Sequence, residues 1–365
     1  MTCRFRLLVA ALALASVPMI AQDPDYLKGL KPYVPQQKVS GTIRNWGNNY
    51  IPALLKEWEN GFRKYQPDVH FETNLKGTET AVAGLYGNIA NVAFVGREIY
   101  KSESQGFEER FGYTPLSLEI SSGSYNTPHK TFALMVFVHK DNPITKLTLA
   151  QLDAIFGCEQ RQGAKQPIRT WGQLGLTGEW ANQPIHVYGY NFETGMAGFF
   201  RMVVLKDSYK WNSELKDFNN GRTGDGEVIN AGVYVLEALA KDRYGIAFAN
   251  VLYENSSVKT LALARHDRGP FIAPTKENVW QRTYPITRFT NVVINRAPGQ
   301  PVDPTIKEFL RYILSREGME AVVRDGAYLP LTEALIEEQL RKLESPPVSK
   351  SGRNATGKTR NKGLR

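Results

Sequence analysis

The chain has 365 residues, a formal net charge of +9 and two cysteines. Arg4 and Arg6 contribute two of these charges, and the basic residues of the last twenty positions, 346–365, contribute six more, which leaves +1 for the remainder. A body so close to neutral excludes a basic nucleic-acid-binding face. Five scattered histidines and the lack of paired cysteines give no metal-ligand spacing, so we expect no metal and no other cofactor.

The first residues have the layout of a secretory signal. Arg4 and Arg6 precede an apolar run from Leu7 to Ala15, which is too short to span a bilayer. We therefore expect residues 1–21 to be a signal peptide and the protein to be exported to a bacterial periplasm. Residues 346–365 combine Pro, Ser, Gly, Lys and Arg without aromatic residues, which predicts a disordered basic tail.

Strands and helices alternate in the segment that follows the leader. Strands are predicted at Val39–Trp46, Val69–Leu75 and Ala90–Val95, with one helix between the first two and a second from Glu79. Helical spacing is clear in the first helix, whose apolar residues are Ile51, Leu54, Leu55, Trp58, Phe62 and Tyr65. This order predicts an α/β sheet covered by helices, with ligands at the carboxyl ends of its strands.

A second α/β unit is predicted to begin near Thr131. It opens with a continuous apolar strand up to His139, typical of a sheet covered on both faces. Thr148 and Gln151 have capping-box spacing at the start of a short helix. Further strands are predicted at Pro184–Tyr188 and Tyr244–Ala249, with a helix at Gly232–Lys241 between them.

The chain is then expected to return to the first unit. Strands at Lys259–Ala264 and Phe289–Asn295, a helix capped by Asp303 and a last helix from Thr332 are assigned there. The predicted organisation is therefore two lobes with two crossings and a ligand cleft that can close by hinge motion. Lobe I is expected to be discontinuous, with residues 39–127 plus 247–343, and lobe II to comprise residues 128–246.

Three turns place amide, hydroxyl or glycine residues at predicted helix starts: Asn48-Asn49-Tyr50, residues 77–80 and residues 193–196. Each can serve as an ordinary cap, and each can also present backbone N–H groups to an anion. Three such turns in a two-lobed chain favour an oxyanion site. Motifs for serine hydrolases, zinc proteases and P-loop enzymes are missing from the sequence, so we expect a protein that is not an enzyme.

From about Ser40 to Leu331 the chain resembles the periplasmic phosphate-binding proteins of ABC importers. The resemblance implies a two-lobed type II periplasmic binding protein fold and a monomer. It also implies a ligand, phosphate or a related oxyanion, and delivery of that ligand to a membrane permease. The residues that carry the resemblance are Asn142-Pro143, Leu147-Thr148 through Ile155-Phe156, Thr170-Trp171-Gly172, Thr194-Gly195, Tyr244-Gly245-Ile246-Ala247 and Tyr284-Pro285-Ile286.

The resemblance also implies where the ligand site lies, with some exchanged residues. Gly96 stands at or next to the position of an aspartate that accepts a proton from the ligand, and Tyr190 and Met196 replace an arginine and a threonine. Arg97 could restore a positive charge, which would favour a fully ionised oxyanion or another acidic solute, whereas Glu193 argues against an anion unless it points away. The expected ligand-binding residues are Asn49, Tyr50, Thr78, Arg97, Thr194 and Gly195.

One other class of protein remains open at this point. The alternative is a scaffold or sensor subunit that has lost the ligand and acts through protein partners. A hydrolase would need a nucleophile or a metal cluster, and the sequence offers neither. A titration with oxyanions distinguishes the first two classes.

Overall fold

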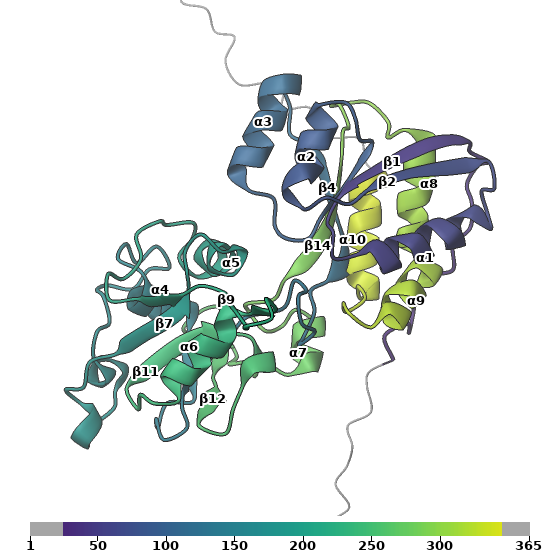
Figure 1. Ribbon diagram of the computed structural model, residues 1–365. Helices are drawn as coiled ribbons and strands as arrows, with labels where there is room; N and C mark the ends of the chain where they lie inside the picture. The colour runs from purple at the N-terminus through teal and green to yellow at the C-terminus, as the bar shows by residue number, and fades with distance from the viewer. Residues whose placement is uncertain (1–24, 345–365) are drawn as a thin grey trace, which may run out of the picture.

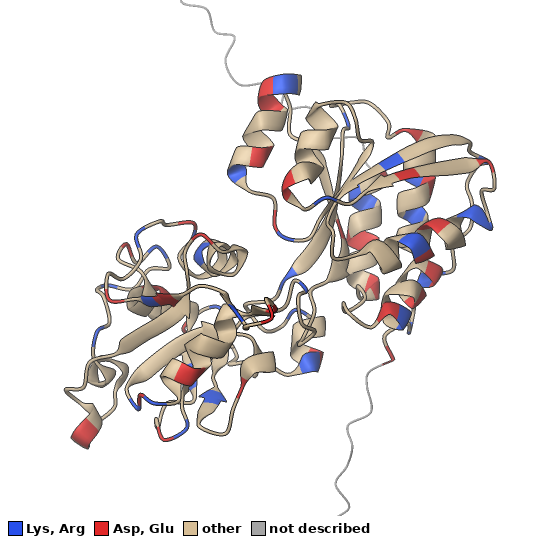
Figure 2. Ribbon diagram, viewed as in Figure 1, with Lys and Arg blue, Asp and Glu red and all other residues tan. Residues whose placement is uncertain are grey.

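A computed structural model describes residues 25–344, so the predicted signal peptide and basic tail lie outside the described residues. The chain forms two lobes, each built around a five-stranded sheet with helices packed against it (Figure 1). Basic and acidic residues are interspersed over both lobes (Figure 2). Between residues 25 and 344 there is no helix both long and apolar enough to cross a membrane.

The first sheet contains strands from both ends of the chain, in the order β2-β1-β3-β14-β4. β1 runs parallel to β2 and β3, whereas β14 runs antiparallel to both of its neighbours, β3 and β4. Its strands are β1 Gly41–Gly47, β2 Val69–Asn74, β3 Val92–Val95, β4 Leu116–Ser122 and β14 Phe289–Ile294. The first lobe is therefore discontinuous in sequence.

Helices cover both faces of this sheet. Because successive strand side chains point to opposite faces, Val92 and Phe94 of β3 pack with one group of helices, and Ala93 and Val95 with the other. The first group is α1 Pro52–Arg63, α8 Pro304–Ile313, α9 Arg316–Asp325 and α10 Glu333–Glu344, and the second is α2 Glu79–Tyr86 and α3 Lys101–Phe111.

Two sequence patterns in the first lobe are confirmed. The apolar stripe of α1 is buried from Ile51 to Phe62, and Trp58 Nε1 donates to the carbonyl of Gly318 in α9 at 2.8 Å. Asp303 caps α8, since its side chain accepts from the first N–H groups of the helix. Tyr65, expected to continue the stripe, lies beyond the end of α1 and is 39% exposed.

The second sheet has the order β12-β5-β11-β7-β8. Its strands are β5 Met135–His139, β7 His186–Tyr190, β8 Lys216–Phe218, β11 Gly245–Ala249 and β12 Val258–Thr260; the helices of this lobe are α4 Leu149–Phe156, α5 Gly195–Val204, α6 Ala231–Leu239 and α7 Lys276–Trp280. The capping box of α4 is confirmed. Thr148 accepts the N–H of Gln151 at 3.2 Å, and the Gln151 side chain accepts the N–H of Thr148 at 2.9 Å.

Short elements complete the second lobe. Two-stranded ladders join β6 Lys146–Thr148 with β13 Ala262–Ala264 and β9 Gly221–Arg222 with β10 Val228–Ile229, and 3₁₀ turns occupy Trp171–Leu174, Gly178–Trp180 and Val251–Tyr253. The expected return of Lys259–Ala264 to the first lobe is wrong. β12 pairs antiparallel with β5, and β13 pairs with β6, because the buried strand β5 needs a partner on its open edge. The chain rejoins the first sheet only at β14.

The two crossings between the lobes lie side by side. Gly123, on the first crossing, donates its N–H to the carbonyl of Arg288, on the second, at 2.6 Å. A Cβ at Gly123 would lie 2.6 Å from the carbonyl oxygen of Thr131 and 3.0 Å from Cβ of Arg288. Only glycine allows the two chain segments to approach this closely. Arg288 is therefore held at the junction of the two lobes.

Candidate functional site

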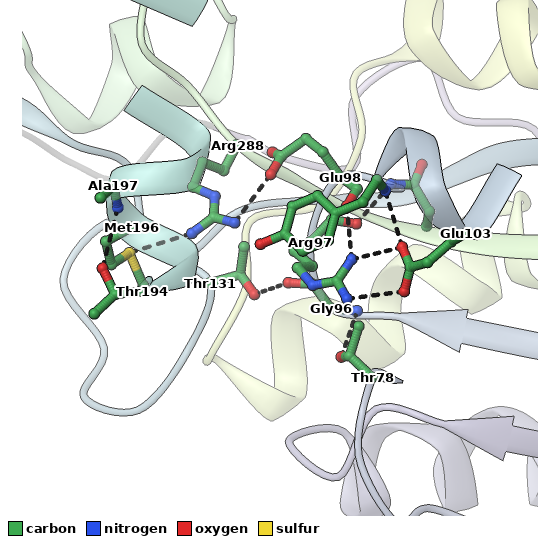
Figure 3. Close-up of polar contacts among 12 residues, drawn as sticks. Thr78, Gly96, Arg97, Glu98, Glu103, Thr131, Thr194, Met196, Ala197 and Arg288 are labelled. Carbon is green, nitrogen blue, oxygen red and sulfur yellow. Dashed lines mark hydrogen bonds and ion pairs between the residues drawn. The ribbon is translucent and has the colours of Figure 1, made fainter. Parts of the chain in front are cut away.

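The carboxyl ends of β1 and β3 meet the start of α2 at the edge of the first lobe that faces the second (Figures 1 and 3). The Asn48 N–H donates to the carbonyl of Phe94 at 2.9 Å, and its side-chain Oδ1 accepts the N–H of Tyr50 at 2.9 Å. The Gly96 N–H donates to Thr78 Oγ1 at 3.1 Å. These bonds fix the first-lobe wall of the site.

Gly96 leaves room for the side chain of Asn48. A Cβ at position 96 would lie 2.6 Å from Asn48 Nδ2, and this buried amide nitrogen has no hydrogen-bond partner among the described residues. Thr131, which is also buried, donates its hydroxyl to the Gly96 carbonyl. The Asn48 amide, which lies beside the Tyr328 hydroxyl, therefore places a donor in the space at Gly96, where the resemblance implies that the family's acceptor carboxylate is lost.

Arg97 lies in the wall with its hydrogen-bonding capacity largely used. Its Nη1 and Nη2 each donate to a different oxygen of Glu103 at 2.9 Å, and Nη1 also donates to the Glu98 carbonyl at 3.0 Å. The guanidinium carbon lies 3.8 Å from the centre of the Tyr100 ring. Burial lowers the pKa of Arg97, but the hydrogen bonds and charge of Glu103 outweigh it and hold the pKa above its ordinary value.

Arg288 reaches both lobes from the second crossing. Its Nη2 donates to Glu98 Oε2 at 3.0 Å on the first lobe, and its Nη1 points at Met196 Sδ, 3.2 Å away on α5 (Figure 3). The guanidinium also lies over the Phe199 ring, 4.7 Å from its centre. The side chain of Arg288 is only 2% exposed, and within residues 25–344 neither its Nε nor Glu98 Oε1 has a partner.

The second-lobe wall is the first turn of α5. Thr194 Oγ1 accepts the N–H of Ala197 at 3.2 Å, while its hydroxyl donates to the Asn191 carbonyl at 2.7 Å. The N–H groups of Gly195 and Met196 come at the open end of the helix, where a helix offers no acceptor of its own and favours a negative charge.

Tyr100 connects the two walls. Its hydroxyl oxygen lies 3.8 Å from the position of a Cβ at Gly195 and 3.4 Å from that of a Cβ at Gly198. Burial raises the pKa of Tyr100, so the hydroxyl stays protonated at neutral pH. Tyr100 also stacks on Arg97, so this one ring contacts Arg97 and lies next to the first turn of α5.

The structure places Asn49 and Tyr50 differently from the other expected site residues. Both are exposed, α1 is preceded by Ile51, and no side chain caps that helix. The Tyr50 carbonyl accepts from Lys130 Nζ at 2.5 Å. Capping by the turn residues is confirmed for Thr194 alone, because Thr78 uses its Oγ1 to accept from Gly96 and makes no cap bond with α2.

A cavity of about 880 Å³ opens between α3 and α5 and is lined by residues of both lobes that include Tyr100 and Glu193. Thr194 is the one expected ligand-binding residue in its lining, which does not include Arg97 or Arg288. Glu193 is exposed there, so water screens its charge. No group of His, Cys, Asp or Glu in residues 25–344 is arranged to hold a metal ion.

Sequence reasoning missed four side chains of this site: Asn48 as a donor, and Glu98, Glu103 and Arg288. One signal pointed near Arg288, since it follows the Tyr284-Pro285-Ile286 segment of the resemblance by two residues and directly precedes a buried strand.

Comparisons with known proteins agree with this architecture. Residues 35–317 match the model of the PBP superfamily domain. The chain is 33% identical over 336 residues to the phosphate-binding protein PstS of Pseudomonas aeruginosa, covering 92% of this chain and 96% of the relative. It is 22% identical over 288 residues to Protein SphX of Synechococcus elongatus, covering 78% and 76%. The crystal structure of PstS from Borrelia burgdorferi shares the fold, with a TM-score of 0.53 and 19% identity over 81% of this chain and all of that one.

Proposed function

The chain belongs to the PstS family of phosphate-binding proteins within the PBP superfamily, and we propose that it captures phosphate or a related oxyanion between its lobes. One observation carries the proposal: donors of both lobes and of the crossing between them lack a full set of acceptors among the described residues. They are the buried amide of Asn48, the guanidinium of Arg288 and the open N–H groups at the start of α5. An oxyanion supplies the missing acceptors.

The ligand-binding residues of the proposal are Asn49, Tyr50, Thr78, Arg97, Thr194 and Gly195. Gly195 offers a backbone N–H group at the positive end of the α5 dipole, and Thr194, whose own N–H donates to the Asn191 carbonyl at 2.9 Å, caps that helix. Thr78 keeps its hydroxyl hydrogen available, because its oxygen accepts from Gly96. Arg97 contributes positive potential and stacks on Tyr100, while Asn49 and Tyr50 are exposed next to Asn48 in the chain.

The chemistry of this wall favours a fully ionised ligand. At Gly96 there is no side chain to accept a proton from the ligand, and Asn48 places a donor in that space. A donor meets a lone pair of a dianion well but meets the O–H of a protonated ligand poorly. The proposed ligand class is therefore dianionic tetrahedral oxyanions.

Export to the periplasm, a monomeric state and delivery to the permease of an ABC importer belong to the same proposal. They are supported by the secretory pattern of residues 1–21 and by membership of the family. The proposed role is solute capture and involves no chemical conversion of the ligand.

Calorimetric titration of the exported protein with phosphate, sulfate and arsenate at pH 8 tests the proposal. Binding of at least one ion is the expected result. The second candidate, a ligand-free scaffold or sensor acting through protein partners, is favoured by one observation: Arg97 and Arg288 already carry carboxylate partners. A folded protein that binds none of the three ions would support that candidate.

A further inference from the structure

Two buried arginines lie in the site, and they differ in how completely they are paired. A guanidinium has five N–H donors. Arg97 meets Glu103 with two parallel bonds and has Glu79 3.8 Å away, so strong acceptors surround it. Arg288 has one strong bond, to Glu98, and one contact with the thioether of Met196, which is a weak acceptor.

We propose that the Arg288 guanidinium binds the ligand and that the Glu98 carboxylate pairs with this guanidinium until the ligand displaces the carboxylate. This inference rests on the proposed function. A buried cation with unfilled donors is costly unless further acceptors arrive. Arg288 Nε has no partner among the described residues, and Nη1 has only sulfur. A tetrahedral oxyanion has enough oxygens to fill both positions.

Geometry places Arg288 where a ligand between the lobes would contact it. The side chain starts on the second crossing, contacts Met196 and Phe199 of α5, and pairs with Glu98 beside the end of β3. Arg288 Nη1 therefore already contacts the first turn of α5, whose open N–H groups favour an anion. The planar fork of arginine suits two oxygens of such an anion.

Glu98 has the properties of a replaceable partner. Only one of its oxygens accepts from Arg288, while the other is buried without a partner in residues 25–344. The bond is single, in contrast to the two-bond pair of Arg97 with Glu103. Exchange of Glu98 for the ligand keeps an anion beside the buried guanidinium throughout, and the displaced carboxylate regains water.

The test compares three variants with the wild type in titrations with inorganic phosphate at pH 8. Arg288→Ala should weaken binding by roughly ten- to a hundredfold, because it removes charge-assisted bonds. Arg97→Ala removes an arginine whose donors are already paired with Glu103, and it should weaken binding less than Arg288→Ala does. Glu98→Gln should bind several-fold more tightly, because a neutral amide is a weaker competitor for Arg288.

If Arg288→Ala does not fold, Arg288→Lys provides the test, because lysine keeps the positive charge but lacks the planar guanidinium. We expect Arg288→Lys to bind phosphate more weakly than the wild type does. Wild-type affinity in folded Arg288→Ala or Arg288→Lys would overturn the inference, and so would weaker binding by Glu98→Gln. Phosphate binding by Glu98→Gln but not by wild type would reject capture by the native protein and still support Glu98 as the blocking anion. If neither protein binds phosphate, the inference about Arg288 is overturned, and the titrations with sulfate and arsenate decide the proposed function.

Discussion

Gly96 and Asn48 should be energetically coupled, because the side chain of one fills the space left by the other. In Gly96→Ala the new Cβ would lie 2.6 Å from Asn48 Nδ2, 2.8 Å from Cγ and 3.0 Å from Oδ1. All three distances are shorter than van der Waals contact, so the buried amide must move. Its movement breaks the 2.9 Å bond that Oδ1 accepts from the N–H of Tyr50.

The expected cost follows from these contacts. Overpacking of a buried site costs about 1–3 kcal/mol, so Gly96→Ala should lower the free energy of unfolding by that amount. Asn48→Ala removes one hydrogen bond and should cost about 1 kcal/mol. In the double variant no Asn48 amide remains for the new Cβ to clash with. Its loss of unfolding free energy should therefore be close to that of Asn48→Ala alone. The coupling free energy is then about 1–3 kcal/mol.

Urea unfolding of the wild type, both single variants and the double variant measures this coupling. Gly106→Ala in α3 is the matched control, because its new Cβ would have its nearest neighbour, Tyr86, at 3.6 Å. That variant should be neutral or stabilised by up to about 1 kcal/mol, since alanine favours helix. Additive losses for Gly96→Ala and Asn48→Ala, within about 0.5 kcal/mol, would refute the reasoning.

Three further predictions concern other parts of the molecule. Burial raises the pKa of the Asp153 carboxyl, so the folded state binds its proton more tightly than the unfolded state does. The contribution of Asp153 to the free energy of unfolding therefore grows as pH falls from 7 through the raised pKa. Asp153→Asn should remove this pH-dependent increase in urea unfolding measured across that range. Trp58→Phe should cost about 2–3 kcal/mol in urea unfolding, because it leaves a gap and removes the hydrogen bond from the indole to the Gly318 carbonyl; an unchanged midpoint would contradict this. Thr194→Ala and Thr148→Ala should each lose about 1 kcal/mol of helix capping, but only Thr194→Ala should weaken phosphate binding by calorimetry; equal affinity in both would place Thr194 outside the site.

Local patterns in the sequence predicted local structure well. The stripe of α1 and the caps formed by Thr148 and Asp303 each depend on residues within a few positions, so spacing alone indicates them. Some elements of the first lobe were not predicted. The helix α3 was missed because Phe107 is its single buried residue and the helix has no apolar stripe. The strand β4 and the helix α9 were not predicted either.

The candidate site could be predicted only where its residues mark helix starts. Thr194 was found this way. The partner of Arg97 is Glu103, six positions away across the start of α3, and the partners of Arg288 are 92 and 190 positions away. Spacing cannot indicate such pairs, because the tertiary structure brings them together. For the same reason, the pairing of β12 with β5 could not be read from a short strand without a distinctive partner motif.

The strand order of the first sheet affects how the chain folds as it is synthesised. β14 lies between β3 and β4, so β4 has no neighbouring strand until residues 289–294 have left the ribosome. The second lobe is assembled from one continuous stretch and can close its sheet earlier. Through most of synthesis the first lobe therefore exposes two unpaired strand edges, which are prone to aggregate. A chain with this topology depends on late completion of its first half, and truncation after β13 would leave the first sheet open.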